Sequence, residues 1–378
     1  MKHLITLSLF LWSACMCGAS ETNQVPSSKN QPNQLEAIVV RAPRIDSLNT
    51  PLSREEMLDE DRDLNAGQVV DHIPGVSSAC TSIDTPEPVV RGLGWERVPA
   101  QLDFLPLYGS CPARMDPPTV YLTPESIENL TLVKGLPSVT YGSGGTGGRV
   151  MVRSVADPTQ PALNGYGANA GFTWNGGRDG YTGRIGGTLG NGKMEASAGA
   201  NVIDLHDYES GGGKTVPAEN QSYGASAKMR YTPNADTGYF VNWNYHKVDH
   251  LDYPALPMDA THVTSHTLTA GARHKNLGET FQTLEWQAGY ANSDHMMDNA
   301  LKSNRAMMDA SADTKSETFG GRLATGWAFS DAAEWTFGLD GHHLNRDGTR
   351  TRVVKAGPNA GTYYDAIWPD ADQGQLGL

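Results

Sequence analysis

The second half of the chain is a series of strand-like segments, roughly 11 to 19 residues each, in which apolar and polar side chains alternate. The segments lie near residues 162–175, 179–191, 193–209, 222–233, 237–249, 266–277, 281–297, 316–330 and 333–347. Alternation is clearest in a run of four large side chains, Tyr239, Val241, Trp243 and Tyr245. It recurs, with one slip of register, between Phe281 and Tyr290. Because alternate residues of a strand share a face, the pattern predicts long antiparallel strands with one apolar face.

The connections between these segments alternate in length. Short ones lie at Asn191–Gly192, Pro233–Asp236, Asn276–Glu279 and Ser330–Ala333, and long ones at 209–221, 250–265 and 298–315. Alternating short turns and long loops are typical of transmembrane β-barrels. A Greek-key sandwich is the alternative for a glycine-rich all-β chain, but long strands with this loop pattern fit it poorly. The prediction is a mainly β protein with an antiparallel transmembrane barrel.

Composition agrees with this fold class. The chain has 42 glycines against 8 phenylalanines, which suits many strands and turns better than a helical core. Its mean hydropathy of −0.43 looks polar, as expected when lumen-facing residues alternate with lipid-facing ones. The formal charge of −13 excludes a nucleic-acid-binding protein, which requires a basic face.

The N-terminus carries export and tether signals. Residues 1–20 read as a signal peptide, with Lys2 before a short apolar run and small residues at its end. Residues 21–49 form a polar, flexible tether that contains one isolated β-prone run, Leu35–Val40. Such a run is either an ordinary edge strand or a segment that a partner captures by strand addition.

A compact mixed segment lies between tether and barrel, over 50–157. Apolar spacing predicts a helix over 67–73, which stops at Pro74-Gly75. Short strands are expected at 88–91, 101–104, 126–133 and 149–152. The glycine-rich run 141–148 lacks the Gly-Lys-Ser/Thr ending of a phosphate-binding loop, so it predicts a tight turn with positive φ angles.

Two clusters of soft metal ligands stand far apart in the sequence. Cys111 and Met115 lie four residues apart, and can face one way if Pro112–Met115 forms a turn. His295 and Met297 lie two apart on a predicted strand, so their side chains share a face. Thiolate, thioether and imidazole together suit copper(I). The alternative is that the methionines only fill a core.

The cysteines leave one further question open. Once a signal peptide is removed, only Cys80 and Cys111 remain. In an oxidising compartment they either form a disulfide or leave Cys111 as a free thiol for a metal.

The segment 50–157 contains short motifs that resemble those of the TonB-dependent receptors of Gram-negative outer membranes. These motifs are Val70-Asp-His-Ile-Pro-Gly75, Val90-Arg-Gly92, Ile127-Glu128, Val133-Lys-Gly135 and Tyr141-Gly142. The resemblance covers nearly the whole chain and implies a plug domain over 50–157 followed by barrel strands over 158–378. It also implies an energy-coupling box that binds TonB, formed by Glu36, Ala37, Ile38, Val39 and Val40.

Within that family, the Cys-x-x-x-Met and His-x-Met clusters look like those of the copper-importing OprC/NosA group. The resemblance implies that copper is the bound cargo, ligated by Cys111 and Met115 from the plug and by His295 and Met297 from the barrel. It implies no organic cofactor. Four other methionines are expected to relay or collect copper: Met258, Met296, Met307 and Met308.

The chain departs from the family in strand number. Such receptors close about 22 strands around the plug, whereas this sequence predicts about nine or ten. An open sheet would expose unpaired edges to lipid, so the chain is expected to be the N-terminal part of a longer barrel. The last residues are expected to form a polar loop.

Two other functions were weighed. A receptor for a siderophore or another metal chelate shares the scaffold, and would leave the methionines as packing residues. A copper oxidase requires several His-x-His motifs, and the sequence has none, since His342 and His343 are adjacent. The sequence also lacks a nucleophile elbow and a His-Glu-x-x-His motif, so it predicts a transporter and no enzyme.

Overall fold

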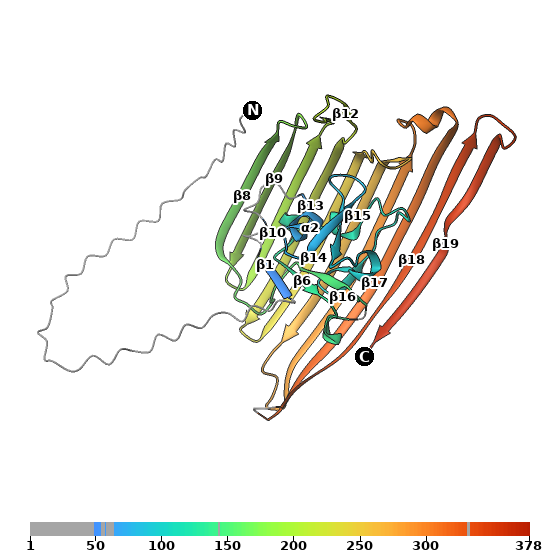
Figure 1. Ribbon diagram of the computed structural model, residues 1–378. Coiled ribbons are helices and arrows are strands. Elements are labelled where there is room, and N and C mark those ends of the chain that lie inside the picture. Colours follow the sequence, from blue (N-terminus) through green and yellow to red (C-terminus); the bar gives the residue numbers. More distant parts are fainter. Residues whose placement is uncertain (1–48, 54–56, 58–63, 143, 331–332) are drawn as a thin grey trace, which may run out of the picture.

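The structure is a computed structural model that describes residues 49–53, 57, 64–142, 144–330 and 333–378. It has two parts: a small mixed domain, the plug (β1 to β7), and a long sheet, the wall (β8 to β19). The plug lies against one face of the wall (Figure 1). Among the described residues, no helix is long and apolar enough to cross a membrane.

The plug consists of short elements joined by tight loops. They are β1 (Asn49–Ser53), α2 (Ala66–Asp71), β2 (Val76–Cys80), β3 (Pro86–Val90), η1 (Trp95–Arg97), β4 (Ala100–Leu102), β5 (Leu105–Leu107), η2 (Pro118–Tyr121), η3 (Pro124–Ser126), β6 (Asn129–Lys134), η4 (Val139–Tyr141) and β7 (Gly148–Arg153). Five strands form one sheet in the order β1-β6-β7-β4-β5, and β2 pairs with β3. Only the β4–β7 pair in the larger sheet is parallel.

The helix and four strands predicted in the plug are present, with boundaries shifted by a few residues. Asn65 caps α2, since its side-chain oxygen accepts from the N–H of Gln68. The sequence pattern missed β1, β2 and β5, because strands of three to five residues carry too little alternation to be recognised.

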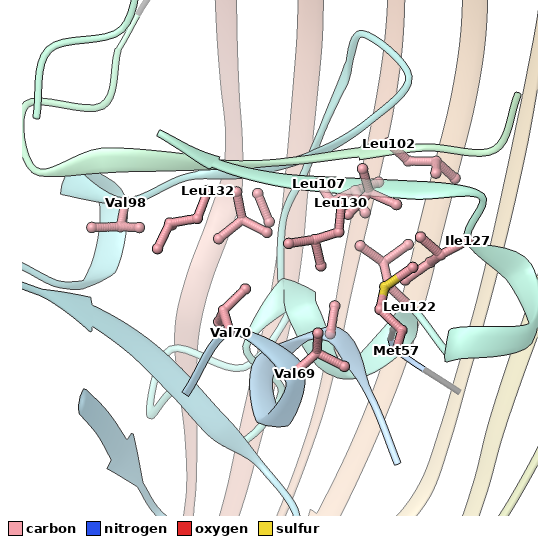
Figure 2. Packing of buried hydrophobic residues seen from close by; sticks show 14 of the residues in the cluster. Met57, Val69, Val70, Val98, Leu102, Leu107, Leu122, Ile127, Leu130 and Leu132 are labelled. Atoms are coloured by element: carbon pink, nitrogen blue, oxygen red, sulfur yellow. The ribbon is translucent and has the colours of Figure 1, made fainter. Parts of the chain in front are cut away.

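The plug has its own hydrophobic core. Val69 and Val70 of α2 face Leu130 and Leu132 of β6, and all four are buried (Figure 2). Leu102 of β4 lies in the same fully buried cluster. This core gives the plug a rigid body on which the loop after β5 is mounted.

The wall contains ten long strands, each hydrogen-bonded to the next along the chain. They are β8 (Asn164–Asn175), β9 (Gly180–Asn191), β10 (Met194–Leu205), β13 (Asn220–Asn234), β14 (Thr237–Leu251), β15 (Asp259–His274), β16 (Phe281–Asp298), β17 (Met308–Ser330), β18 (Ala333–Val354) and β19 (Gly361–Gly377). The short elements β11 (Tyr208–Glu209), β12 (Thr215–Val216) and η5 (Ser303–Ala306) lie in long loops. Within the described residues the sheet is open, with β8 and β19 as its edges.

One sequence expectation about the wall is wrong. The last residues were expected to form a polar loop, but they form β19, which pairs with β18 over most of its length. The sequence pattern missed this strand because many of its side chains are polar. A barrel strand needs an apolar side chain only on one of its two faces. The slip of register expected near Phe281 is confirmed by an irregularity between Phe281 and Thr283.

The outward face of the wall is apolar and the inward face is polar. Tyr239, Val241 and Trp243 are exposed on the outside of β14, whereas Asn242 and Asn244 between them are buried against the plug side. Aromatic side chains gather at the end of the wall that carries the short turns: Tyr231, Tyr239, Phe281, Trp327, Phe329, Trp335 and Phe337. An aromatic girdle beside an apolar band is the pattern of a barrel in an outer membrane.

Polar contacts join the plug to the wall. Arg178, in the turn between β8 and β9, donates to both oxygens of Asp84 at 2.9 Å, and both side chains are buried. Thr269 of β15 donates to Asp103, and Lys228 of β13 donates to the carbonyl of Ser154 at 2.7 Å. These contacts set the height of the plug inside the wall.

The glycine-rich turn behaves as predicted. Gly142, Gly144 and Gly145 have φ angles of +88°, +89° and +84°. Arg149 donates to the carbonyls of Tyr141 and Gly144, so the turn is wrapped around a guanidinium.

Three of the sequence expectations cannot be followed in the structure. The signal peptide, the tether and the box at Glu36–Val40 lie outside the described residues. The expected plug–barrel boundary at 157/158 falls in the connection between β7 and β8.

Candidate metal centre

The two ligand clusters reach the same place from different parts of the fold. Cys111 and Met115 lie in the loop between β5 and η2 of the plug, and His295 and Met297 lie near the end of β16. Counting strands from the plug places that end of β16 beside the long loops, which is the outer side of the barrel. The turn expected over Pro112–Met115 is present, since the N–H of Arg114 donates to the carbonyl of Cys111 at 3.0 Å.

The sulfur atoms of plug and wall are in contact. Cys111 Sγ lies 3.9 Å from Met297 Sδ. Met115 is 1% exposed and belongs to the same buried cluster as Cys111 and Met297. The structure therefore brings three sulfur donors together across the plug–wall boundary.

His295 is buried without any hydrogen bond. Its side chain is 0% exposed, and neither ring nitrogen has a hydrogen-bond partner among the described residues. Its Nδ1 lies 3.8 Å from an oxygen of Asp116, beyond hydrogen-bond length. A buried imidazole normally finds a partner, so a ring with two unpartnered nitrogens beside a sulfur cluster has the properties of a metal ligand.

Asp116 organises the loop that carries the plug ligands. Its carboxylate accepts from the N–H and the hydroxyl of Ser110 at 2.8 and 3.0 Å, and from the N–H of Cys111 at 3.0 Å. It also accepts from the Tyr121 hydroxyl at 2.6 Å. These bonds hold Cys111 in place and leave a negative charge next to His295, where it would favour a cation.

Tyr253 closes the site from the loop between β14 and β15. Its hydroxyl donates to the carbonyl of Met115, and its N–H donates to Asp259 at 2.7 Å. Burial and the nearby Asp116 carboxylate raise the pKa of both Tyr253 and Tyr121 well above its usual value, so both phenols stay neutral and act as donors.

Both described cysteines, Cys80 and Cys111, are free, so the disulfide alternative is absent from this structure. Cys111 is buried and Cys80 is exposed on β2. Burial raises the pKa of the Cys111 thiol to about 12, and the Asp116 carboxylate adds to the rise. The thiol is therefore protonated near neutral pH until a metal displaces the proton.

The four additional methionines differ in how far they are buried. Met258 packs against the buried cluster. Met296 is 46% exposed and turns away from Met297, which is 3% exposed, as expected for neighbours on a strand. Met307 is exposed in the loop before β17, and Met308 is half-buried at its start.

A cavity of about 900 Å³ lies beside the centre, between the plug and strands β17 to β19. Cys111 and Asp116 line one side of it. On the other side, the Arg346 guanidinium lies over the rings of Tyr108 and Trp368, at 5.3 and 4.9 Å from their centroids.

Sequence reasoning missed Asp116 and Tyr253. Asp116 follows Met115 directly, so an acidic residue next to a soft ligand pair was a usable signal. Tyr253 lies in a loop far from either cluster, and only the fold places it at the site.

The comparisons with known proteins agree with this architecture. Residues 45–149 match the family model of the TonB-dependent receptor plug domain. No curated protein sequence matches the chain.

Several solved structures share the fold. The copper transporter OprC is 22% identical over 87% of this chain and 50% of its own, with a TM-score of 0.71. The FrpB iron transporter from Neisseria meningitidis is 11% identical over 87% of this chain and 61% of its own, with a TM-score of 0.63. The siderophore receptor PiuA from Acinetobacter baumannii is 15% identical over 87% and 52%, with a TM-score of 0.59.

The chain spans half the length of OprC, and at these identities the likeness concerns the fold. Residues 45–149 are therefore a plug domain of the TonB-dependent receptor type, and the antiparallel strands that follow, with their apolar outer face, share the fold of these solved transporters and receptors.

Proposed function

We propose that the receptor imports copper, and that Cys111, Met115, His295 and Met297 hold the ion between plug and wall. One observation carries the proposal. An imidazole that is fully buried, with no hydrogen bond at either nitrogen, lies beside a Cys–Met sulfur pair 3.9 Å apart. A site with only a packing role would leave that imidazole unsatisfied at a cost of about 1–3 kcal/mol.

The donor set favours copper(I) over its main rival. Zinc also takes thiolate and imidazole in tetrahedral sites, but thioethers are not among its usual ligands. Soft thiolate and thioether donors select copper(I), and two of the four proposed ligands are thioethers. The similarity in fold to a copper transporter supports the same cargo.

Import requires a partner, because the outer membrane has no energy source of its own. We propose that Glu36–Val40 adds as a strand to TonB, as the β-prone sequence on a polar tether suggests. The change Val39→Pro removes a backbone donor and is expected to stop import while copper binding survives. Copper uptake at the normal rate by this variant would refute the assignment of the box.

The chelate receptor is the second candidate, and the cavity beside the centre favours it. Its volume of about 900 Å³ suits an organic ligand. Arg346, held between Tyr108 and Trp368, would bind an anionic or aromatic chelator. Such a receptor would depend on Arg346 and would tolerate loss of Cys111.

The test measures copper bound per chain after anaerobic loading with Cu(I) and removal of excess by a chelator. We expect one copper per chain, and little or none in Cys111→Ser or in Met297→Leu. Each has a matched control in the same molecule. Cys80→Ser changes an exposed thiol, and Met296→Leu changes the neighbouring thioether that faces outward.

The control variants are expected to bind copper like the wild type. If Cys111→Ser and Cys80→Ser retain copper equally, the centre does not hold the ion. If copper arrives only with a chelator and is lost in Arg346→Gln, the second function replaces the first.

A further inference from the structure

A second group of metal-ligand side chains lies at the outer rim of the wall, separate from the sulfur centre. Glu219 immediately precedes β13, His250 lies near the end of β14, and Asp252 begins the loop to β15. One ligand atom of each lies within 4.8 Å of the other two. Two carboxylates and one imidazole therefore converge from two segments of the chain, with Glu219 in one and His250 and Asp252 in the other.

Backbone contacts hold this group in place. The N–H of Asp252 donates to the carbonyl of Glu219 at 3.0 Å, and the N–H of Glu219 donates to the Asp252 carboxylate at 3.1 Å. His250 Nε2 lies 3.0 Å from the other oxygen of Asp252. The paired ends of two strands thus position Asp252 and His250, and the Glu219 carboxylate is held by a hydrogen bond from the Gln221 amide at 2.7 Å.

The charges in the group do not balance. Asp252 is buried and Glu219 is half-buried, and a single imidazole faces both carboxylates. Lys302, whose charge also acts on Asp252, pairs with Asp259 at 2.7 Å. Two adjacent, partly desolvated carboxylates repel each other, and a divalent cation would relieve that repulsion.

We infer that Glu219, His250 and Asp252 form a binding site for a borderline divalent cation, Zn²⁺ or Cu²⁺. Imidazole nitrogen with carboxylate oxygens suits both ions and is a poor donor set for Cu⁺. The rim site thus differs in chemistry from the sulfur centre and does not depend on it for its ligands.

The rim site is joined to the sulfur centre by one residue. Tyr253 follows Asp252 directly, and its hydroxyl donates to the carbonyl of Met115. A cation bound at Asp252 would therefore order the loop that closes the inner centre.

The test uses two probe ions on the purified full chain in detergent. Zn²⁺ reports the rim site, and Ag⁺, a soft monovalent ion like Cu⁺, reports the sulfur centre. In a Cys111→Ser background, which removes the competing thiol, we expect one bound Zn²⁺. His250→Gln is expected to weaken it by at least about 10-fold, since even outer partners of a metal ligand cost about 10- to 100-fold.

A second variant and a matched control guard against misfolding. Asp252→Asn keeps the size of the side chain and still accepts from Glu219, so it tests the ligand charge alone. His343→Gln changes another histidine of the wall, in the middle of β18, which pairs with Asp372 at 3.2 Å but has no third ligand within reach among the described residues. Zn²⁺ affinity should fall in Asp252→Asn and stay unchanged in His343→Gln.

The outcomes separate this inference from the copper proposal. Equal Zn²⁺ affinity in His250→Gln, Asp252→Asn and His343→Gln overturns the rim site, whatever Ag⁺ does. If Zn²⁺ binding is sensitive to His250 while the wild type, with Cys111 in place, fails to bind Ag⁺, the result supports the rim site and contradicts the sulfur centre.

Discussion

The plug and the wall arrange the same kinds of residue in opposite ways. The plug is a small domain with an apolar interior, centred on α2 and β6, and a polar surface. The wall has its apolar side chains outside, where lipid covers them, and its polar ones inside. The two parts therefore meet polar face to polar face, as the buried Arg178–Asp84 pair illustrates.

The sulfur centre is where this rule breaks. Cys111 and Met115 of the plug pack with Val263 and Met297 of the wall in one apolar cluster that crosses the boundary. The other large core also reaches the wall, since it includes Ala291 of β16 and its Leu105 lies against Gly289 and Gly320. Under the copper proposal, this apolar contact is the place where the soft ion would be held.

The largest effect is expected from breaking the buried ion pair between the two parts. Arg178→Met leaves the Asp84 carboxylate buried with only Asn220 as a side-chain partner. Such a loss costs about 3–5 kcal/mol, and should lower the urea midpoint at which the plug unfolds. The double variant with Asp84→Asn should cost less than the single one, because no uncompensated charge then remains. Equal stability of the wild type and both variants would show that polar contacts do not hold the plug.

The next largest effect compares an apolar residue in the plug core with one on the outer face of the wall. Leu130→Ala opens a cavity in the plug core and is expected to cost about 2–5 kcal/mol. Leu323→Ala removes a leucine from the outer face of β17, where lipid fills the space, and is expected to change stability by less than about 1 kcal/mol. Urea unfolding of both variants in the same detergent measures the difference. Equal losses would contradict the assignment of the outer face to lipid.

A smaller effect concerns the contact that closes the sulfur centre. Tyr253→Phe removes the donor to the Met115 carbonyl and leaves a buried acceptor unpaired, at about 1–3 kcal/mol. Amide hydrogen exchange of residues 111–116 is expected to speed up, while exchange in β6 stays unchanged. Uniform acceleration in both segments would mean that Tyr253 acts on the whole plug.

The smallest effect is pH-dependent and lies where the chain leaves the plug. Burial alone would raise the pKa of Asp157, but hydrogen bonds from Lys275 and Thr159 bring it down to about 2, from an ordinary value of 3.8. A lowered pKa means that ionised Asp157 stabilises the fold above about pH 4, and that this contribution is lost as the pH falls towards about 2.

The pair is partly exposed, so its contribution is expected to stay below about 1 kcal/mol. Lys275→Met should lower the urea midpoint at about pH 5 and have little effect at about pH 2.5. The same loss at both pH values would show that Lys275 acts through packing and not through charge.

The sequence by itself determined the class of fold and named the candidate ligand residues. Period-two alternation and alternating loop length are local properties, so Tyr239 to Tyr245 predicted a strand with an outward apolar face without any knowledge of its neighbours. The same local rule placed His295 and Met297 on one face and Met296 on the other. The rule of alternation failed for β19, because many of its side chains are polar, and the strand is recognised only from its pairing with β18.

Only the tertiary structure decided which of these residues meet. The number of residues between Cys111 and Met297 does not determine the distance between their sulfur atoms. That distance depends on the height at which Arg178 and Thr269 hold the plug in the wall. The lack of a hydrogen-bond partner for the His295 ring nitrogens is also decided by the tertiary structure, because it depends on which groups pack against the ring. The group of Glu219, His250 and Asp252 exists because the paired ends of β13 and β14 bring two distant segments together, and pairing of strands is a long-range interaction that no local pattern records.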